Sequence, residues 1–389
     1  MSFVIRMMLL ILLFCSFAHA TTQFLTISDI HYGLENTDKD GQDTGPEFLK
    51  ITWNKLNELS KNVDFLLFLG DIPSHSFFID PHLRDYEKTI FQGLYQNDAD
   101  AKPLFYVPGN NDSLQGNYQP FETEGISPLN YAKDWNGACA HCAGLIIDGS
   151  HMYHDGYYSS YVLPQSKDIM LIALNATQWT RIPWLKRTFF SKYRNQEKDA
   201  RAQFEWLEQQ LKNHSAKQLL IAVHEPPGLT YLGEPMWYPQ YTRQFIALLS
   251  KYHKLYGQIS VLSAHTHMEE FRRLQLTDGS FIYVYSTPGI SRNHHNYPGM
   301  KVFRVNDTLQ FSNFTTYYTS NLHTWNNEHY QALGVSNAIF PDCQHKTLAQ
   351  CLDGLNVNQV CEDLDRGAFY GVKSPRVKNT ACRKTYPVN

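Results

Sequence analysis

Short apolar runs recur along the chain, and longer amphipathic or irregular stretches separate them. Each run spans about four to eight residues, and several are rich in Val, Ile, Leu or Phe, a composition typical of buried strands. We therefore predict strands over residues 23–27, 63–69, 103–107, 168–174, 218–223, 259–262 and 281–285.

Segments between these runs place apolar residues on one face at helical spacing, which predicts helices over residues 48–61, 200–212 and 241–252. Strands that alternate with helices indicate an α/β fold. The strand pattern fades after about Tyr318. We therefore predict a main domain over residues 21–320 and a cysteine-bearing extension over residues 321–389.

The N-terminus has the features of a signal peptide over residues 1–20. Arg6 supplies a positive charge, Met7–Phe14 is a short apolar run, and Ala18-His19-Ala20 matches the small-residue cleavage pattern. The apolar run is too short to span a membrane. We predict cleavage after Ala20 and a secreted or periplasmic protein.

Bulk composition excludes several classes of protein. The 389 residues are 43% hydrophobic, 14% aromatic and 18% charged, which indicates an ordered globular chain. A formal charge of −3 and a pI near 6.6 give no basic footprint for nucleic acid. No later segment approaches the length of a transmembrane helix, so we expect no stable membrane anchor, and we expect a monomer.

Cysteine usage agrees with export. Of the seven cysteines, Cys15 would leave with the signal peptide, and an even number would remain for disulfides. Cys139 and Cys142 form a C-x-x-C for which we favour a local disulfide; a redox motif or half of a metal knuckle are the alternatives. The other four, which sequence cannot pair, are Cys343, Cys351, Cys361 and Cys382.

Polar clusters follow five of the predicted strands, at the carboxyl ends where α/β folds form their sites. Asp, His and Asn are ligands suited to divalent metal ions, and two such ions can clamp a phosphate. Each cluster alone is weak, because Gly-Asp is an ordinary turn and a lone His is usually structural. Together and in this order they indicate a metal site: Ser28–His31, Gly70-Asp71, Gly109–Asp112, His224–Pro227 and Ala264–His267.

The order D-x-H, G-D, G-N-x-D, H and H-x-H resembles the calcineurin-like metallophosphoesterase superfamily. Gly70–His75 resembles the GDxPxH stretch of the acid sphingomyelinase-like phosphodiesterases, His224–Gly228 their HxPPG, and His265–Phe271 their HTHxDEF. The resemblance covers residues 29–271. It implies a four-layer α/β/β/α sandwich of two mixed sheets, with a Cys-rich C-terminal subdomain.

The resemblance also implies two divalent metal ions, with zinc preferred. A hydroxide shared by the metals would attack phosphorus in line. One ion would be held by Asp29, His31 and His267, the other by Asn110, His224 and His265, and Asp71 would bridge them.

Ser74 stands where the iron-tyrosinate purple phosphatases would carry Tyr, which speaks against that group. Two positions depart from relatives. Ala264 replaces the Gly that usually precedes H-x-H. The larger departure is Asn111, where many relatives have a His that donates a proton to the leaving oxygen. An amide cannot act as an acid near neutral pH.

Three hypotheses account for Asn111. In the first, catalysis is lost and the chain is a non-catalytic metal- or phosphate-binding protein. In the second, His75 takes over as general acid. In the third, the substrate has a good leaving group, such as a phosphoanhydride. The endopolyphosphatase relatives, which also show G-N-N-D, support the third. We favour His75 as the acid because the related branch has a His there already.

The resulting prediction is a secreted two-metal phosphodiesterase acting on phosphodiester or phosphoanhydride bonds of small soluble substrates. An endopolyphosphatase and a sphingomyelinase-type lipid phosphodiesterase are the alternatives. Lipid is less favoured because the first strand follows the cleavage site directly, which leaves no room for a saposin-like module. Glu234–Tyr238 is predicted to form a substrate wall, whereas His294-His295 rims the site or is a surface loop.

Overall fold

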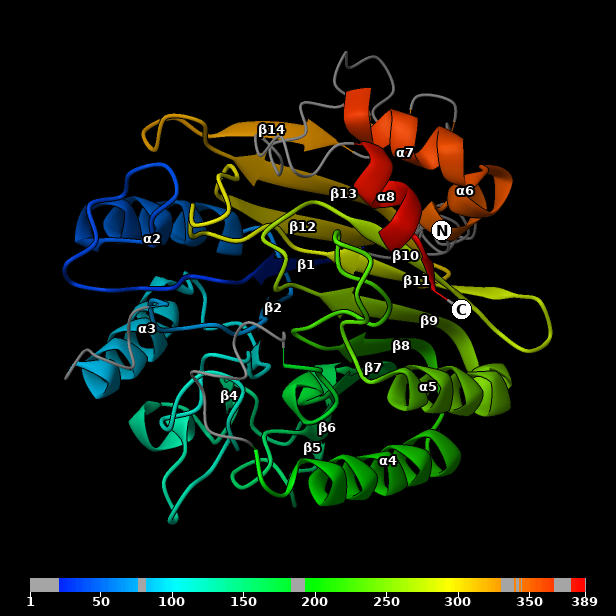
Figure 1. Ribbon diagram of the computed structural model, residues 1–389, viewed down its shortest axis with the longest axis horizontal. Helices are drawn as coiled ribbons and strands as arrows, with labels where there is room; N and C mark the ends of the chain where they lie inside the picture. Colours follow the sequence, from blue (N-terminus) through cyan, green and yellow to red (C-terminus); the bar gives the residue numbers. More distant parts are fainter. Residues whose placement is uncertain are drawn as a thin grey trace, which may run out of the picture.

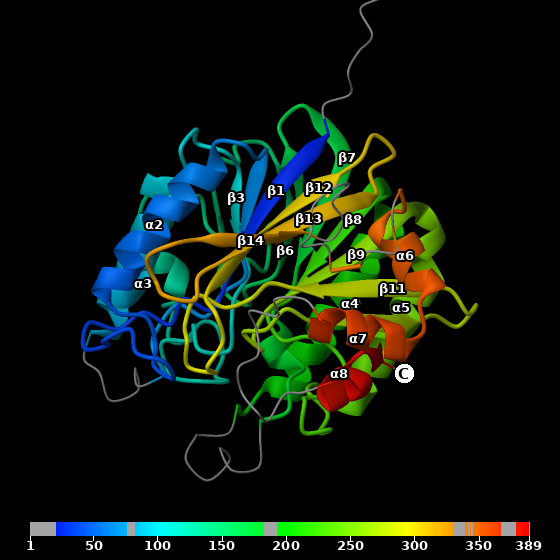
Figure 2. The ribbon, with the colours of Figure 1, turned by 90° about the horizontal axis from the view of Figure 1, so that it is seen from above.

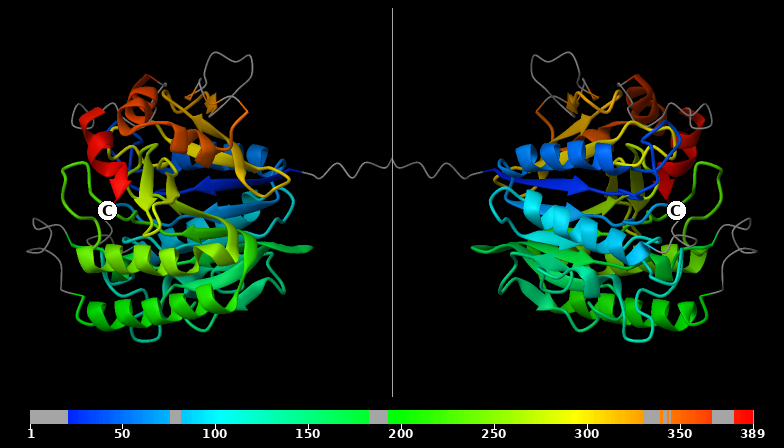
Figure 3. Two further views of the ribbon diagram at one scale, coloured as in Figure 1. Left: turned by 90° about the vertical axis from the view of Figure 1, so that its right-hand side faces the viewer. Right: turned by 90° about the vertical axis from the view of Figure 1, so that its left-hand side faces the viewer.

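The computed structural model describes residues 21–75, 82–182, 193–329, 339–340, 343, 345–366 and 379–388. The predicted signal peptide lies outside these residues. Two mixed β-sheets stack on each other, and helices lie over their outer faces (Figures 1 and 3). This is the predicted sandwich of two mixed sheets flanked by helices.

One sheet has seven strands with a parallel centre, because β1 pairs in parallel with β2 and β2 with β3. Its other pairings are antiparallel. In spatial order the strands are β14 (Asn326–His329), β13 (Phe311–Tyr318), β12 (Gly299–Val305), β1 (Thr22–Ile27), β2 (Phe65–Phe68), β3 (Leu104–Tyr106) and β4 (Cys139–Ala140).

The second sheet has eight strands, with β7, β8, β9 and β11 in parallel. Strand β10 is antiparallel to β11 and parallel to β15, and β6 is antiparallel to both of its neighbours, β5 and β7. In spatial order the strands are β15 (Pro387–Val388), β10 (Phe271–Gln275), β11 (Phe281–Ser286), β9 (Tyr256–Ser263), β8 (Ala216–Ala222), β7 (Ser166–Ala173), β6 (Tyr158–Leu163) and β5 (Ile146–Asp148).

The helices divide between the two sheets. Helices α2 and α3 contribute to the core of the first sheet, and α4 and α5 pack on the second (Figure 2). Helices α6, α7 and α8 belong to the C-terminal region. Their bounds are α2 (Pro46–Ser60), α3 (Leu83–Asn97), α4 (Gln196–Asn213), α5 (Pro239–Tyr252), α6 (Leu348–Gly354), α7 (Val357–Arg366) and α8 (Asn379–Thr385).

Alternation along the strands explains the layering. On β7, Ile169 and Leu171 belong to the cluster between the sheets, whereas Met170 and Ile172 belong to the cluster under α4 and α5. Successive side chains of a strand point to opposite faces, so both faces of β7 are buried. That is why the parallel strands appear in the sequence as continuous apolar runs.

Every strand and helix predicted from the apolar pattern is present, as β1, β2, β3, β7, β8, β9, β11, α2, α4 and α5. The apolar pattern did not predict the remaining elements. They include α3 and also β12, a largely buried strand with a fully buried lysine, Lys301, in its middle. A charge at that position interrupts the apolar run on which the prediction depended.

The C-terminal region adds to both sheets. Strand β14 extends the first sheet and β15 the second, and Leu348 and Leu352 of α6 join the main core. The described cysteines pair as Cys139–Cys142, Cys343–Cys351 and Cys361–Cys382. The local disulfide at C-x-x-C is therefore confirmed. The domain boundary at residue 320 stays a prediction.

None of the described helices has the length and apolar character needed to cross a bilayer.

Candidate active site

The seven predicted metal ligands lie in the loops that follow five strands. Asp29 and His31 follow β1, and Asp71 follows β2. The remaining four come after β3, β8 and β9, as Asn110, His224, His265 and His267. Strands β1 to β3 belong to one sheet and β8 and β9 to the other. The site is therefore assembled from both sheets.

Six of these residues form two groups that have the composition and spacing of metal sites. In each group the three ligand atoms lie within 4.8 Å of one another. Asp29, His31 and His267 make the first group, in which the two Nε2 atoms are 3.2 Å apart. Asp71, His224 and His265 make the second group. The first group has the three members that the family resemblance implied for one ion, whereas the second group contains Asp71 and not Asn110. Two divalent ions suit the two groups.

Asp71 belongs to the second group and also lies close to the first. Its Oδ2 is 3.4 Å from His31 Nε2 in the first group and 3.1 Å from His224 Nε2 in the second. Asp29 Oδ1 is likewise 3.4 Å from His267 Nε2 and 3.6 Å from His224 Nε2. The two groups thus adjoin each other, because Asp71 and Asp29 each lie close to histidines of both groups. The predicted bridging role of Asp71 fits this geometry.

Backbone carbonyls orient the imidazoles. The Nδ1 atom of His31 lies 3.0 Å from the Pro73 carbonyl, and that of His224 lies 2.6 Å from the Leu69 carbonyl. A proton on Nδ1 makes these hydrogen bonds and leaves Nε2 as the free lone pair. This is the usual second contact of a metal-binding histidine.

Buried oxygens in the site lack hydrogen bonds within the described part of the chain. Asp29 Oδ1 and Asn110 Oδ1 are both in this condition. The amide nitrogen of Asn110 donates to Asn117 Oδ1 at 2.7 Å, which fixes the amide so that its oxygen remains as the acceptor. Buried polar atoms are normally satisfied. These oxygens, together with the histidine nitrogens, fit a divalent cation.

Five of the candidate ligands have left-handed backbone conformations. The φ angles are 48° at Asp29, 44° at His31, 63° at Asp71, 70° at His265 and 60° at His267. Such angles are uncommon for residues other than glycine and are concentrated at functional sites, where surrounding structure holds them. These turns lie in the loops where the ligand atoms of the two groups come within 4.8 Å of one another.

Electrostatics also favour a cation here. Burial alone would lower the pKa of His31, but contact with Asp29 and the charge of Asp71 outweigh burial and raise the pKa to about 9. Burial also lowers the pKa of His224, but the charges of Asp71 and Asp29 outweigh burial and hold the pKa well above its usual value. The carboxylates thus stabilise positive charge at both groups. In contrast, burial and the neighbouring His294 lower the pKa of His267.

Asp112, the last residue of G-N-N-D, holds two ligand loops together. Its Oδ2 accepts hydrogen bonds from the backbone N–H groups of Gly109 at 2.7 Å and Asp71 at 3.1 Å, and from the Tyr106 hydroxyl at 2.7 Å. Its Oδ1 accepts from the Ile72 N–H at 2.6 Å. Gly109 is needed at this contact, because a Cβ there would lie 2.1 Å from Asp71 Oδ1.

We expect Asp112→Asn to destabilise the fold by about 2–4 kcal/mol, because the amide has one acceptor oxygen for four buried donors. Chemical denaturation in the presence of a chelator measures this loss without a contribution from metal. Asp278→Asn, at an exposed turn, is the control and should change stability by less than about 0.5 kcal/mol. An equal effect of both variants would contradict this role of Asp112.

His75 lies beside the first group, as predicted. Its ring stacks on that of His31 with centroids 4.1 Å apart, and its side chain is 30% exposed. Its Nδ1 lies 3.0 Å from Asp43 Oδ1 and 2.7 Å from Asn293 Nδ2. Burial and the charge of His31 lower the pKa of His75, and Asp43 opposes them.

Asn111 points to the Asp71 carboxylate. Its backbone N–H donates to Asp71 Oδ1 at 2.8 Å, and its side-chain Nδ2 donates to Asp71 Oδ2 at 2.9 Å. The side chain is 1% exposed. Asn111 therefore orients Asp71, whereas His75 and His294 are partly exposed imidazoles next to the first group.

A small cavity of about 100 Å³ opens next to His265. It includes Glu234, Pro235 and Met236 of the predicted substrate wall, and His294. Trp237 of the same segment is instead fully buried in the core. The remaining lining residues are Tyr118, Arg181, Thr230, Tyr231 and Thr266.

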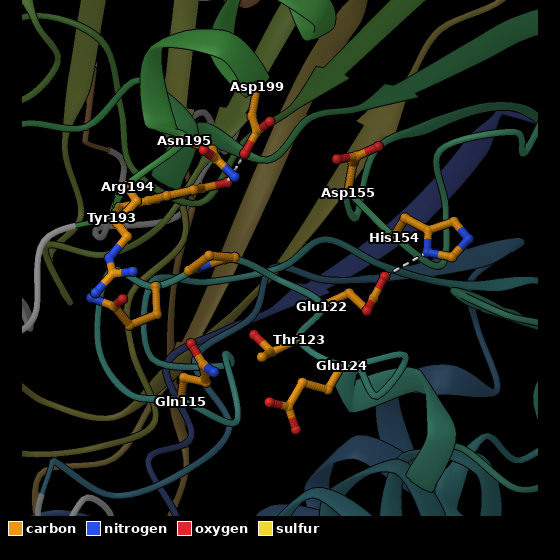
Figure 4. Close-up of a pocket in the computed structure, with 12 residues that line it drawn as sticks. Gln115, Glu122, Thr123, Glu124, His154, Asp155, Tyr193, Arg194, Asn195 and Asp199 are labelled. Atoms are coloured by element: carbon orange, nitrogen blue, oxygen red, sulfur yellow. Dashed lines mark hydrogen bonds and ion pairs between the residues drawn. The ribbon is translucent and has the colours of Figure 1, made fainter.

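A second cavity has a volume of about 620 Å³, and its lining includes Gln115 and Gln119, which flank Tyr118 in the same loop. On one side of it His154 Nδ1 and Glu122 Oε2 form an ion pair at 2.6 Å (Figure 4). Its lining is acidic, because it contains four carboxylates besides Arg194 and His154, those of Glu122, Glu124, Asp155 and Asp199. A polyphosphate chain would be repelled here.

Sequence reasoning missed residues that support the predicted ligands. Asp43 lies far from His75 in sequence. Its carboxylate accepts hydrogen bonds from the backbone N–H of His75 at 2.7 Å and from the Ser291 hydroxyl at 2.9 Å. Asn117, which fixes Asn110, lies in a loop with no motif. No local signal distinguishes these polar loop residues, because only the fold brings them to the site.

Comparisons with known proteins agree with this geometry. The model of the calcineurin-like phosphoesterase family matches residues 22–269. A curated relative, the sphingomyelinase phosphodiesterase D of Dictyostelium discoideum, is 22% identical over 293 residues, which cover 72% of this chain. The matched region spans 61% of the length of that relative.

Among solved structures, a dimetal phosphatase from Danio rerio aligns with a TM-score of 0.48 and 12% identity, over 80% of this chain and 99% of that one. A purple acid phosphatase from yellow lupin aligns with a TM-score of 0.42 and 12% identity, over 80% and 53%. The family model spans more than half of the chain and includes the five loops that supply the two groups. The chain therefore belongs to the calcineurin-like phosphoesterase family.

Proposed function

We propose that the protein is an exported two-metal phosphodiesterase that hydrolyses soluble phosphodiesters or phosphoanhydrides. The observation that carries the proposal is the pair of adjoining Asp/His groups, in which the Asp71 carboxylate contacts histidines of both groups. Family membership supports a metal-dependent phosphoester hydrolase. The pairing of the described cysteines in disulfides, and the signal-like pattern of residues 1–20, support export.

In this proposal Asp29, His31 and His267 hold one ion, and Asn110, His224 and His265 hold the other. We propose zinc, because histidine-rich donor sets with few carboxylates suit it. When bound, the ions supply Lewis acidity toward the phosphoryl oxygens and lower the pKa of water. Asp71 contacts both groups, and Asn111 fixes the orientation of its carboxylate.

His75 is the proposed general acid. It is a partly exposed imidazole on the rim of the first group, and Asp43 and Asn293 contact its Nδ1 atom. When Nδ1–H donates to Asp43, Nε2 carries a proton for the leaving oxygen only while the ring is protonated. Burial lowers the pKa of His75, and Asp43 opposes this effect. Asn111 cannot give a proton to the leaving oxygen, because it is a buried amide, and its side-chain Nδ2 and its backbone N–H donate to Asp71.

The cavities support a short substrate. The small cavity beside His265 offers the guanidinium of Arg181 and the side chains of Tyr231 and Met236. The larger cavity is acidic and would repel an extended polyphosphate. A compact diester or dinucleotide-like anhydride fits these surroundings better than a long polyanion.

A lipid phosphodiesterase is the second candidate, and one observation favours it: the curated relative is named a sphingomyelinase phosphodiesterase. Sphingomyelin turnover in detergent micelles separates the two candidates. Faster turnover of sphingomyelin than of soluble diesters would replace the soluble substrate class with lipid.

The decisive test is hydrolysis of bis-p-nitrophenyl phosphate by zinc-loaded protein, before and after treatment with a chelator. We expect turnover that a chelator reduces at least about 100-fold and that added zinc restores, because both charge stabilisation and the activated water depend on the ions. A panel of nucleotides, polyphosphate and choline diesters then ranks the substrates.

Metal-loaded protein that is inert toward all of these compounds would contradict the enzymatic proposal. A non-catalytic metal- or phosphate-binding protein would then be the function, and calorimetric titration with phosphate would show binding without turnover.

A further inference from the structure

The segment after H-x-H carries a glutamate for which the proposed reaction has no use. Glu269 comes two residues after His267, and its side chain is completely buried. It forms an ion pair with Lys301, which is also completely buried. Thr316 Oγ1 donates to Glu269 Oε2 at 2.9 Å, and Lys301 Nζ donates to the Ser286 carbonyl at 2.8 Å.

The surroundings of Lys301 are aromatic. Its Nζ lies 4.4 Å from the ring centroid of Phe314, 5.3 Å from that of Phe271 and 5.5 Å from that of Phe303. Such contacts stabilise a cation through the ring faces, but they do not replace its hydration fully. The ammonium group therefore needs the charge of Glu269 as its counter-ion. The ion pair and the hydrogen bond from Thr316 hold the Glu269 carboxylate in one position.

The pair joins the two sheets next to the first ligand group. Lys301 lies on β12 of the first sheet and Glu269 in the loop between β9 and β10 of the second. Lys301 is in register with Thr26 of β1, the strand that leads into Asp29. The first group draws Asp29 from the β1 loop and His267 from the β9 loop. One ion pair thus links the two chain segments that must meet there.

A buried ion pair is poor evidence for stability, because uncharged replacements of similar volume are often neutral or stabilising. Its position between two segments that supply ligands points to a different effect. We propose that Glu269 and Lys301 are positioning residues that hold the His267 loop against the end of β1 and thereby set the affinity of the first divalent-ion site. The inference rests on the proposed function for the identity of the ligands.

The test compares metal affinity with the stability of the metal-free protein. In Glu269→Leu/Lys301→Met both charges are removed together, so no unpaired charge is left. We expect the thermal unfolding midpoint in chelator to stay within a few degrees of wild type or to rise. We expect the affinity for one of two zinc ions, measured by equilibrium dialysis, to fall about 10–100-fold, the usual effect of losing a contact that orients a ligand.

Phe314→Leu is the matched control. It loosens the aromatic surroundings of Lys301 but leaves the ion pair in place. We expect a lower unfolding midpoint and unchanged zinc affinities. Thr316→Val, which removes one hydrogen bond to Glu269, should fold in any case and should weaken one zinc site about 3–10-fold.

A double variant that folds and binds both zinc ions as tightly as wild type would overturn the inference. If the double variant does not fold, unchanged zinc affinities in Thr316→Val overturn it instead. Wild-type protein that binds no divalent ion is a different result: it refutes the ligand assignment of the proposed function, and this inference with it.

Discussion

Asp71→Asn is expected to lower kcat/KM at least about 10³-fold, or roughly 4 kcal/mol of transition-state stabilisation, and to reduce the bound metal from two ions to at most one. Asp71 Oδ2 lies within 3.4 Å of an imidazole nitrogen in each ligand group. An amide would bring either a neutral oxygen or an N–H donor into this position. Neither can replace a charged bridge between two cations.

Metal content by elemental analysis and steady-state hydrolysis of bis-p-nitrophenyl phosphate measure the two effects. Asp168→Asn is the control, because that carboxylate forms an exposed ion pair with Lys217 at 3.0 Å, and we expect less than a twofold change. The bridging role is refuted if Asp71→Asn keeps two ions and more than a tenth of the wild-type activity.

His75→Ala is expected to leave two metal ions bound and to affect substrates according to their leaving groups. Turnover of an alkyl diester should fall about 10²–10⁴-fold, since its alkoxide needs a proton from the acid. Turnover of the p-nitrophenyl diester should fall less than about 10-fold, because p-nitrophenolate leaves without one. Parallel kinetics on the two esters, with elemental analysis, give the comparison.

His295→Ala provides the control, since His295 is an exposed histidine on the adjoining loop, where it pairs with Asp40 at 3.4 Å. We expect both esters to be turned over at the wild-type rate by this variant. Equal losses for the two esters in His75→Ala would show that His75 supports the site without donating the proton.

The parallel strands could be predicted from the sequence because they are buried on both faces, and continuous apolar runs result. Strand β12 could not, since Lys301 interrupts its run. Lys301 is tolerated inside the protein only because Glu269, distant in sequence, pairs with it between the sheets. A local pattern contains no information about such a partner.

In the candidate site, too, some features could be predicted from the local sequence and others could not. The order of D-x-H, G-D, G-N-N-D, H and H-x-H after strands is a local property, and it was sufficient to select Asp29, Asp71 and His224 from many similar residues. The left-handed turns at five ligand positions, and the hydrogen bonds of Asp112 to the Gly70-Asp71 loop, depend on contacts between segments about 40 residues apart or more.

By itself, the sequence determined the α/β class, the strands that lead into the site, a set of candidate metal ligands and the absence of an acid at position 111. Each follows from short-range pattern: apolar periodicity, residue type and position after a strand. The tertiary structure decided that Asn111 serves Asp71, that Asp43 and Asn293 fix His75, and that Glu269 binds Lys301 across the sheets. These are pairings of buried polar groups, and only packing of the two sheets determines which donor meets which acceptor.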